Sequence, residues 1–195
     1  MELIFATNNQ HKADEILVAL PGGFSIKTLK QAGIDLDIPE PHETLEDNAR
    51  EKAQTIYALN QQDCFSEDTG LEVAALKGRP GVRSARYAGN HSTSAQNIEL
   101  LLTELGEEND RTAQFRTVIC ALLGGKENFF EGICSGTIGR KPSGTAGFGY
   151  DSVFIPDGTT KTFAEMDVSE KNKFSHRRKA VDKLVAFLEH SNLNK

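Results

Sequence analysis

The chain lacks several features that would place it in common functional classes. Among its 195 residues only Cys64, Cys120 and Cys134 are cysteines, which cannot all pair and show no CxxC or Cys/His spacing typical of structural zinc. No apolar run approaches the roughly 20 residues that a membrane helix needs, and the first residues lack the basic, apolar and small-residue order of a signal peptide. We therefore expect a soluble protein without disulfides, in a reducing cytoplasm, with no membrane segment.

The chain also lacks an excess of positive charge. Its 22 basic and 28 acidic residues give a formal net charge of -6, whereas proteins that bind duplex nucleic acid usually carry net positive charge. Hydrophobic residues make up 38% of the chain, which argues against general disorder. This length fits one domain, or one domain with a small lobe, and can bury roughly 70% of the unfolded surface.

Hydrophobic periodicity predicts alternating strands and helices, and hence an α/β fold. The expected strands are residues 2–6, 24–29, 64–76 (in two pieces hinged at Thr69-Gly70), 112–123 and 128–138. The expected helices are one after residue 9, one capped by Thr44, one over residues 94–105 and a closing one that contains Ala180. The last two strands are expected to form a hairpin at residues 124–127.

A T-x-N-x-x-K pattern, Thr7-x-Asn9-x-x-Lys12, lies at the first strand-to-helix turn. The N-terminus of a helix presents unpaired N–H groups and a positive dipole, so an anion can bind there. The turn is not a Walker loop, because the glycines and the GK[ST] ending are missing. Taken alone, the pattern also fits an asparagine cap followed by a surface lysine.

Adjacent carboxylates, Glu67 and Asp68, precede Thr69-Gly70. Successive side chains of a strand point to opposite faces, so only one of them enters a given site unless the strand ends there. Gly70 indicates such an end. A carboxylate at a strand end is a usual magnesium ligand or general base, and Glu40 offers a second carboxylate. A polar strand end followed by a turn is the simpler interpretation of this motif alone.

Two aromatic residues, Phe148 and Tyr150, lie among glycines in Gly147-Phe148-Gly149-Tyr150-Asp151. Glycines let a flat ligand approach the backbone, and stacking of a base on an aromatic ring contributes roughly 1–3 kcal/mol. An aromatic plug in a turn explains the motif equally well.

A basic segment, Lys161 to Lys183, contains seven basic and four acidic residues in an otherwise acidic chain. Such a patch attracts a triphosphate. A solvated helix face, or a complement to the negative end of a helix dipole, is the more common role of such a run.

Six segments, taken in order, resemble the inosine triphosphate pyrophosphatase family. They are FATNNQHKADEI, SEDTGLEVAALKGRPGVRSARYAG, FRTV, GFGYDSVFIP, TFAEM and EKNKFSHRRKA. The resemblance implies an α/β fold whose long, curved mixed β-sheet carries helices that form two lobes around a nucleotide cleft. It also implies that residues 1–195 form a single nucleoside triphosphate pyrophosphatase domain.

The resemblance further implies an activity. We expect magnesium-dependent hydrolysis of ITP, dITP and XTP to the nucleoside monophosphate and pyrophosphate, which keeps these nucleotides out of DNA and RNA, and we expect a homodimer. A pyrophosphatase of broader or different base specificity is an alternative. A nucleotide-binding regulatory module without catalysis is another, although the joint presence of Lys12, Glu40 and Asp68 argues against it.

Roles for single residues also follow from the resemblance. Asp68 is expected to be the general base, and Glu40 and Asp68 are expected to bind magnesium. The expected substrate-binding residues are Thr7, Asn8, Asn9, Gln10, His11, Lys12, Thr69, Phe148, Gly149, Tyr150, Asp151, Lys171, His176 and Arg177. A donor such as Arg177 can bond the oxygen that hypoxanthine and xanthine carry where adenine carries an amino group.

The sequence shows three departures from the family pattern. Asn8 and Arg178 stand where glycine is frequent, and Glu67-Asp68-Thr69 stands where Asp-Asp-Ser is common. The last replacement keeps carboxylates and a hydroxyl, so we expect the chemistry to survive it. Arg178 is expected either to alter the packing of the closing loop or to add positive charge near the base.

Overall fold

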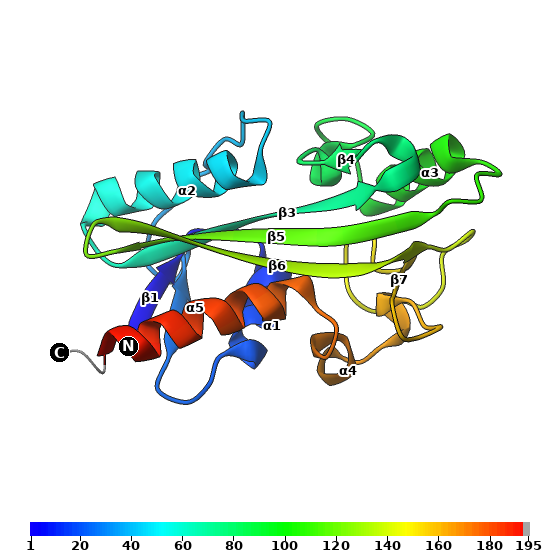
Figure 1. The fold of residues 1–195 in the computed structure, drawn as a ribbon. Helices are drawn as coiled ribbons and strands as arrows, with labels where there is room; N and C mark the ends of the chain where they lie inside the picture. Colours follow the sequence, from blue (N-terminus) through cyan, green and yellow to red (C-terminus); the bar gives the residue numbers. More distant parts are fainter. Residues whose placement is uncertain (193–195) are drawn as a thin grey trace. The chain divides into compact units, whose positions relative to one another are not determined.

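The computed structural model describes the backbone of residues 1–192 and the side chains of residues 1–190. Its strands form a sheet in the order β2-β1-β3-β5-β6-β7, with β4 paired to β3 (Figure 1). The strands are β1 (Glu2–Phe5), β2 (Ser25–Thr28), β3 (Cys64–Val73), β4 (Pro80–Gly81), β5 (Thr112–Leu123), β6 (Lys126–Ile138) and β7 (Phe154–Pro156). The α-helices are α1 (Gln10–Ala19), α2 (Leu45–Asn60), α3 (Ser94–Leu105), α4 (Val168–Asn172) and α5 (His176–Asn192). β1 is parallel to β2 and β3, whereas β4 and β7 pair antiparallel with β3 and β6, so the predicted α/β class with a mixed sheet is confirmed.

The chain divides into two compact units. Unit 1 contains residues 1–68, residues 117–132 and the described chain from Arg177 onward, and unit 2 contains residues 69–116 and 133–176. β3, β5 and β6 each contribute residues to both units. The single domain over residues 1–195 and the nucleotide cleft between lobes stay predictions.

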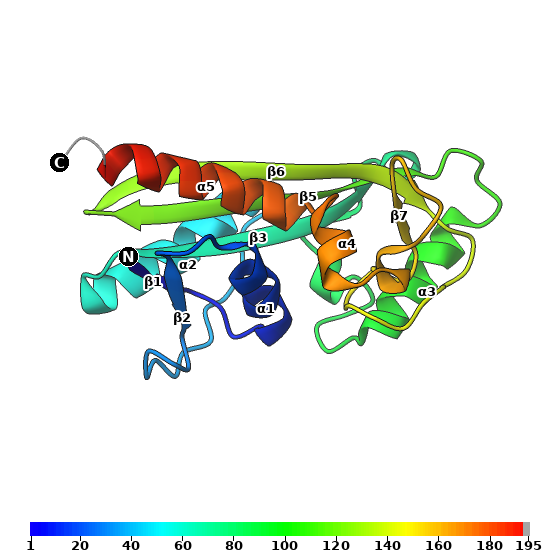
Figure 2. The same ribbon diagram turned by 90° about the horizontal axis from the view of Figure 1, so that it is seen from below.

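Helices cover both faces of the strands in unit 1. α2 lies on one face, and α1 and α5 lie on the other (Figures 1 and 2). The residues of β1 alternate between them, because Leu3 and Phe5 pack with α1 and α5 while Ile4 packs with α2. In β3, Phe65 joins the first cluster and Cys64 the second. Strands buried on both faces take apolar residues at consecutive positions, which explains the short apolar run at the start of the sequence.

Side-chain caps fix the first helices of unit 1. Asn9 accepts the N–H of Lys12 over 3.2 Å at the start of α1, and Thr44 accepts the N–H of Asp47 over 3.1 Å at the start of α2. The helices predicted after residue 9 and Thr44 are therefore confirmed, as are the helix over residues 94–105 and the closing helix.

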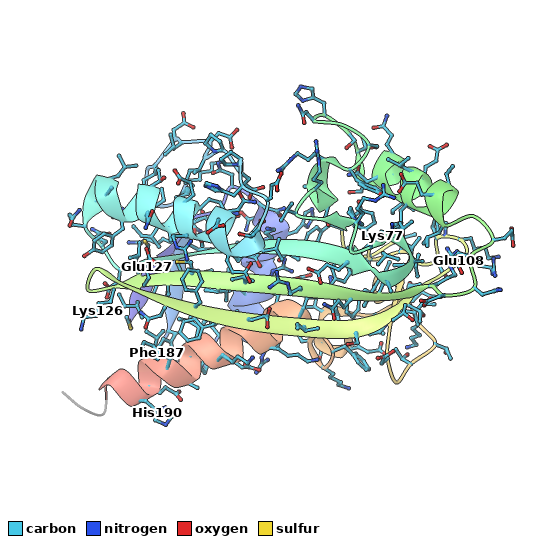
Figure 3. All side chains as sticks on the ribbon, turned by 45° about the horizontal axis from the view of Figure 1, so that its top comes forward. Lys77, Glu108, Lys126, Glu127, Phe187 and His190 are labelled. Carbon is cyan, nitrogen blue, oxygen red and sulfur yellow. The ribbon has the colours of Figure 1, made fainter. Side chains whose placement is uncertain are left out.

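The β5–β6 hairpin is also confirmed, with a turn shortened to residues 124–125. Glu127 lies near its tip (Figure 3). It accepts hydrogen bonds from Arg50 (3.2 Å) and Gln54 (2.6 Å) of α2. Phe130 of β6 meets Phe187 of α5 with 5.5 Å between ring centroids. These contacts hold the hairpin against α2 and α5.

One expectation about β3 is wrong. The sequence predicted two short strands hinged at Thr69-Gly70, but β3 runs without interruption from Cys64 to Val73. Gly70 has a different role, since a Cβ there would lie 2.7 Å from the carbonyl oxygen of Gly81 in β4. Gly70 therefore permits the close approach of β4, and it does not end the strand.

The core of unit 2 is formed by α3 against β3, β5, β6 and the segment from Tyr150 to Met166. Ile98, Leu101 and Leu105 of α3 are buried there. The three cysteines of the chain are buried thiols, as expected for a protein without disulfides. Within residues 1–192, no helix has the length and apolar character needed to cross a membrane.

We expect Gly136→Ala to destabilise the protein. Gly136 of β6 faces β7, where a Cβ would overlap the carbonyl oxygen of Ile155 and approach Pro156, and overpacking of this kind typically costs about 1–3 kcal/mol. Gly139→Ala is the control, because its nearest neighbours stay at 3.5 Å. Urea unfolding of both variants measures the difference, and equal stability of the two would contradict the packing of β7 on β6.

Candidate functional site

The turn between β1 and α1 carries the first group of predicted site residues. The hydroxyl oxygen of Thr7 accepts the N–H of Asn9 over 3.1 Å, and Asn8 donates its side-chain amide to the carbonyl of Leu36 over 2.9 Å. Gln10 and His11 are exposed at the start of α1. The turn borders a cavity of about 580 Å³ lined by Thr7, Asn8, Gln10, Thr28, Lys30 and residues 33–37. A rigid, capped helix start next to open space can bind an anion.

Glu67 points from β3 toward α1 and α5, where basic side chains surround it. Its carboxylate lies 3.1 Å from the ammonium of Lys12 and accepts hydrogen bonds from Nε and Nη2 of Arg177 over 3.1–3.2 Å. Arg177 also pairs with Glu15 of α1. Burial alone would raise the pKa of Glu67, but the charges of Arg177 and Lys12 outweigh it and hold that pKa well below its usual range. Glu67 is therefore a fixed anion.

Asp68, the next residue of β3, points toward α2. Asn48 donates its side-chain amide to Asp68 Oδ2 over 3.2 Å, and the ammonium of Lys52 lies 3.7 Å from Oδ1. Burial is the main reason that the pKa of Asp68 is raised above its usual value; the charge of Glu40 adds to this effect, and that of Lys52 opposes it. A carboxylate with a raised pKa holds a proton more readily than an exposed one, as a general base must.

Lys52 connects the two carboxylates expected to bind magnesium. Its ammonium donates to Glu40 Oε1 over 2.5 Å and to the carbonyl oxygen of Glu67 over 2.7 Å. Asn48 holds the preceding segment, because it accepts the N–H of His42 over 2.9 Å and donates to the carbonyl of His42 over 3.2 Å. The sequence predictions missed Lys52 and Asn48. Their spacing of four residues, on the same face as Leu45 and Ala49, was the only available signal.

The glycine-rich segment of unit 2 is a turn held by its own side chains. Asp151 Oδ2 accepts the N–H of Phe148 over 3.0 Å and the ammonium of Lys171 over 2.6 Å. That ammonium lies 5.3 Å from the ring centroid of Phe148, a cation–π distance. Gly147 has no room for a side chain, because a Cβ would overlap the carboxylate of Asp151. The turn therefore presents Phe148 in a fixed position.

Tyr150 has a structural contact within unit 2. Its ring is buried, and its hydroxyl donates to the carbonyl oxygen of Ser84 over 2.9 Å. Of the two interpretations that the sequence left open for this motif, an aromatic plug in a turn therefore applies to Tyr150. His176, also buried, stacks on Phe115 with 4.6 Å between ring centroids.

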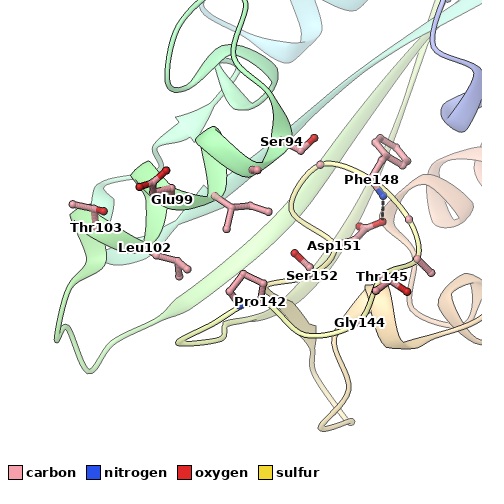
Figure 4. A pocket seen from close by; sticks show the side chains of 15 residues that line it. Ser94, Glu99, Leu102, Thr103, Pro142, Gly144, Thr145, Phe148, Asp151 and Ser152 are labelled. Carbon is pink, nitrogen blue, oxygen red and sulfur yellow. Dashed lines mark hydrogen bonds between the residues drawn. The ribbon is translucent and has the colours of Figure 1, made fainter.

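A cavity of about 850 Å³ adjoins this turn (Figure 4). One face of α3 lines it, including Ser94, Ile98 and Leu102, together with residues 144–149 and Asp151. Phe148 and Asp151 lie at its edge and are joined by their hydrogen bond. The predicted base-binding loop is thus bordered by open space within unit 2.

The predicted residues are divided between the two units. Unit 1 holds those of the α1 turn, Glu40, Asp68 and Arg177, and unit 2 holds Thr69, residues 148–151, Lys171 and His176. Contact of any of them with substrate stays a prediction. Arg178, one of the three departures, forms an ion pair with Asp182 over 2.6 Å on the exposed side of α5.

Comparisons with known proteins give consistent matches. The model of the Ham1 family matches residues 3–187. The dITP/XTP pyrophosphatase of Christiangramia forsetii is 45% identical over 188 residues, 96% of this chain and 99% of the relative. That of Bacillus subtilis is 41% identical over 192 residues, 96% of this chain and 97% of the relative.

Solved structures match as well. The Ham1 protein of Staphylococcus aureus has a TM-score of 0.88 at 38% identity, covering 98% of this chain and 100% of the other. A structure from Mycobacterium abscessus described as nucleoside-triphosphatase / dITP/XTP pyrophosphatase has a TM-score of 0.76 at 36% identity, covering 94% and 98%.

We expect Arg177→Met to destabilise the protein strongly. The substitution removes all three hydrogen bonds from Arg177 to Glu67 and leaves a buried carboxylate undercompensated, a change that typically costs about 3–5 kcal/mol. Arg178→Met is the matched control, since the exposed i,i+4 pair with Asp182 contributes at most about 0.5 kcal/mol. Free energies of unfolding in urea at pH 7 test this expectation, and similar losses in the two variants would contradict it.

Proposed function

The chain belongs to the Ham1 family, and from this membership we propose that it hydrolyses dITP, ITP and XTP to the nucleoside monophosphate and pyrophosphate. The reaction removes non-standard purine nucleotides before they enter DNA and RNA. The observation that carries the proposal is the position of Asp68, a buried carboxylate with a raised pKa beside Glu40 and Lys52.

Asp68 acts as the general base. It accepts a proton from water as the oxygen of that water forms a bond to the α-phosphorus. The bond between the α-phosphorus and the oxygen that bridges to the β-phosphorus breaks, and pyrophosphate leaves with both bonding electrons. Glu67 cannot replace Asp68 in this role, because Lys12 and Arg177 hold its charge and oppose its protonation.

The α1 turn binds the phosphates in this proposal. The N–H groups at the start of α1 and the hydroxyl of Thr7 provide donors, and Lys12 supplies a full positive charge next to them. Positive charge that is fixed before the reaction stabilises the departing pyrophosphate without rearrangement of the protein.

Magnesium fits Glu40 and Asp68 by the chemistry of the donors. Carboxylate oxygens are the protein ligands that Mg²⁺ prefers, and one or two of them suffice when substrate phosphates complete the coordination. Among the described side chains, no cluster of three or more His, Cys, Asp and Glu is arranged for a metal. Glu40 and Asp68 are the proposed ligands because both lie against the ammonium of Lys52. When bound, Mg²⁺ supplies positive charge that polarises the phosphoryl group and neutralises the leaving pyrophosphate.

Base recognition is assigned to Phe148 and to the three residues Lys171, His176 and Arg177. The ring of Phe148 supplies a stacking surface, which is held by Asp151 and Lys171. Donors that face the oxygen of hypoxanthine or xanthine would reject the amino group of adenine, because a mismatched base leaves buried polar groups unpaired. We further propose a homodimer in the cytoplasm.

Turnover of dITP, XTP, ITP, GTP and ATP with Mg²⁺ tests the function. We expect fast release of pyrophosphate from the first three, little reaction with GTP and ATP, and loss of activity when EDTA removes the metal. Asp68→Asn is the control, since it keeps the size of the side chain but cannot accept the proton. Release of orthophosphate, or equal use of ATP, would contradict the proposal, and equal use of ATP would favour the alternative of broader base specificity.

A further inference from the structure

The ammonium of Lys52 contacts both carboxylates that are proposed to bind the metal. It lies 2.5 Å from Glu40 Oε1 and 3.7 Å from Asp68 Oδ1, and its third contact is the carbonyl oxygen of Glu67 at 2.7 Å. The Lys52 side chain is 8% exposed and that of Asp68 is 7% exposed. A single buried cation therefore forms ion pairs with both carboxylates.

Lys52 keeps its charge in this position. Oxygens of Glu40 and Asp68 and the carbonyl oxygen of Glu67 surround the ammonium, and nearby opposite charges favour the charged form of a lysine. The ammonium donates hydrogen bonds to Glu40 Oε1 and to the carbonyl oxygen of Glu67, and its 3.7 Å contact with Asp68 Oδ1 is an ion pair. The protein thus contains its own counter-ion at this site.

A divalent cation competes with this counter-ion. Mg²⁺ binds oxygen at about 2.0–2.1 Å, and the ammonium already occupies one oxygen of Glu40 and lies near one of Asp68. Two cations on the same pair of carboxylates repel each other, and the repulsion is strengthened by the burial of Lys52 and Asp68, because a buried site has a lower dielectric constant than water. The repulsion falls when further negative charge enters, and a nucleoside triphosphate brings such charge.

We propose that Lys52 is a positioning residue that holds Glu40 and Asp68 together in the free protein and makes tight metal binding depend on the nucleotide. The proposal rests on the proposed function, because it takes Glu40 and Asp68 as the metal ligands. With the nucleotide present, phosphate oxygens provide new acceptors for the Lys52 ammonium and additional ligands for the metal. Metal and nucleotide then bind together, and the metal alone binds weakly.

Calorimetric titration with MgCl₂ in the absence of nucleotide tests this proposal. We expect Lys52→Gln to bind free Mg²⁺ about tenfold more tightly than the wild type, a difference of about 1.4 kcal/mol. A purely structural role of Lys52 predicts the opposite, since a damaged site loses affinity. Lys27→Gln is the matched control, because Lys27 forms an exposed ion pair with Glu2 and should leave the affinity unchanged. Equal or weaker binding by Lys52→Gln would overturn the proposal.

Two further measurements keep the test decisive. Lys52→Arg retains the charge and should bind free Mg²⁺ as weakly as the wild type; affinity as high as that of Lys52→Gln would overturn the proposal. If Lys52→Gln fails to fold, the affinity of the wild type for free Mg²⁺ tests the proposal instead. A dissociation constant well below ~1 mM would overturn the proposal. Pyrophosphate release from dITP by the wild type is measured in parallel. Its absence would refute the proposed function, whereas normal release with unchanged metal affinity in Lys52→Gln would refute only the role of Lys52.

Discussion

The alternation of side chains along β3 is the constraint on which the charged site depends. Adjacent residues of a strand face opposite sides of the sheet, so Glu67 and Asp68 enter different surroundings although they are neighbours in the chain. Glu67 meets Lys12 and Arg177 on the side of α1 and α5. Asp68 meets Lys52 on the side of α2. One strand thereby supplies a structural anion and a reactive carboxylate.

The two carboxylates differ because their neighbours differ, although both are buried. Burial disfavours charge on either one, and only a nearby cation with good geometry reverses this. Arg177 binds Glu67 through several charge-assisted hydrogen bonds, which keeps it ionised. Asp68 has a more distant lysine at 3.7 Å and the added repulsion of Glu40. The protein thus fixes the protonation of the two positions separately.

The sequence predicted features that depend on local chemistry, such as the cap formed by Thr44 and the bounds of α3. Prediction from the sequence failed for features that depend on contacts between segments that are distant in the chain. Gly70 was interpreted as the end of a strand, but its missing side chain makes room for β4. Lys52 was missed because helical lysines usually lie in solvent, and its burial depends on carboxylates from two other segments. The bond from the Tyr150 hydroxyl to the carbonyl oxygen of Ser84 also joins distant segments and could not be predicted from neighbouring residues, while contact of Tyr150 with the base stays a prediction.

The central claim is that neighbouring carboxylates on β3 have opposite protonation behaviour. Carbon-detected NMR titration of the Glu67 and Asp68 carboxyl groups in the metal-free wild type measures this directly. We expect the pKa of Asp68 to lie above the usual aspartate value because of its burial and Glu40, and Glu67 to remain ionised well below the usual glutamate value because of Arg177 and Lys12. Ordinary values for both groups, or the reverse order, would contradict the division of roles between them.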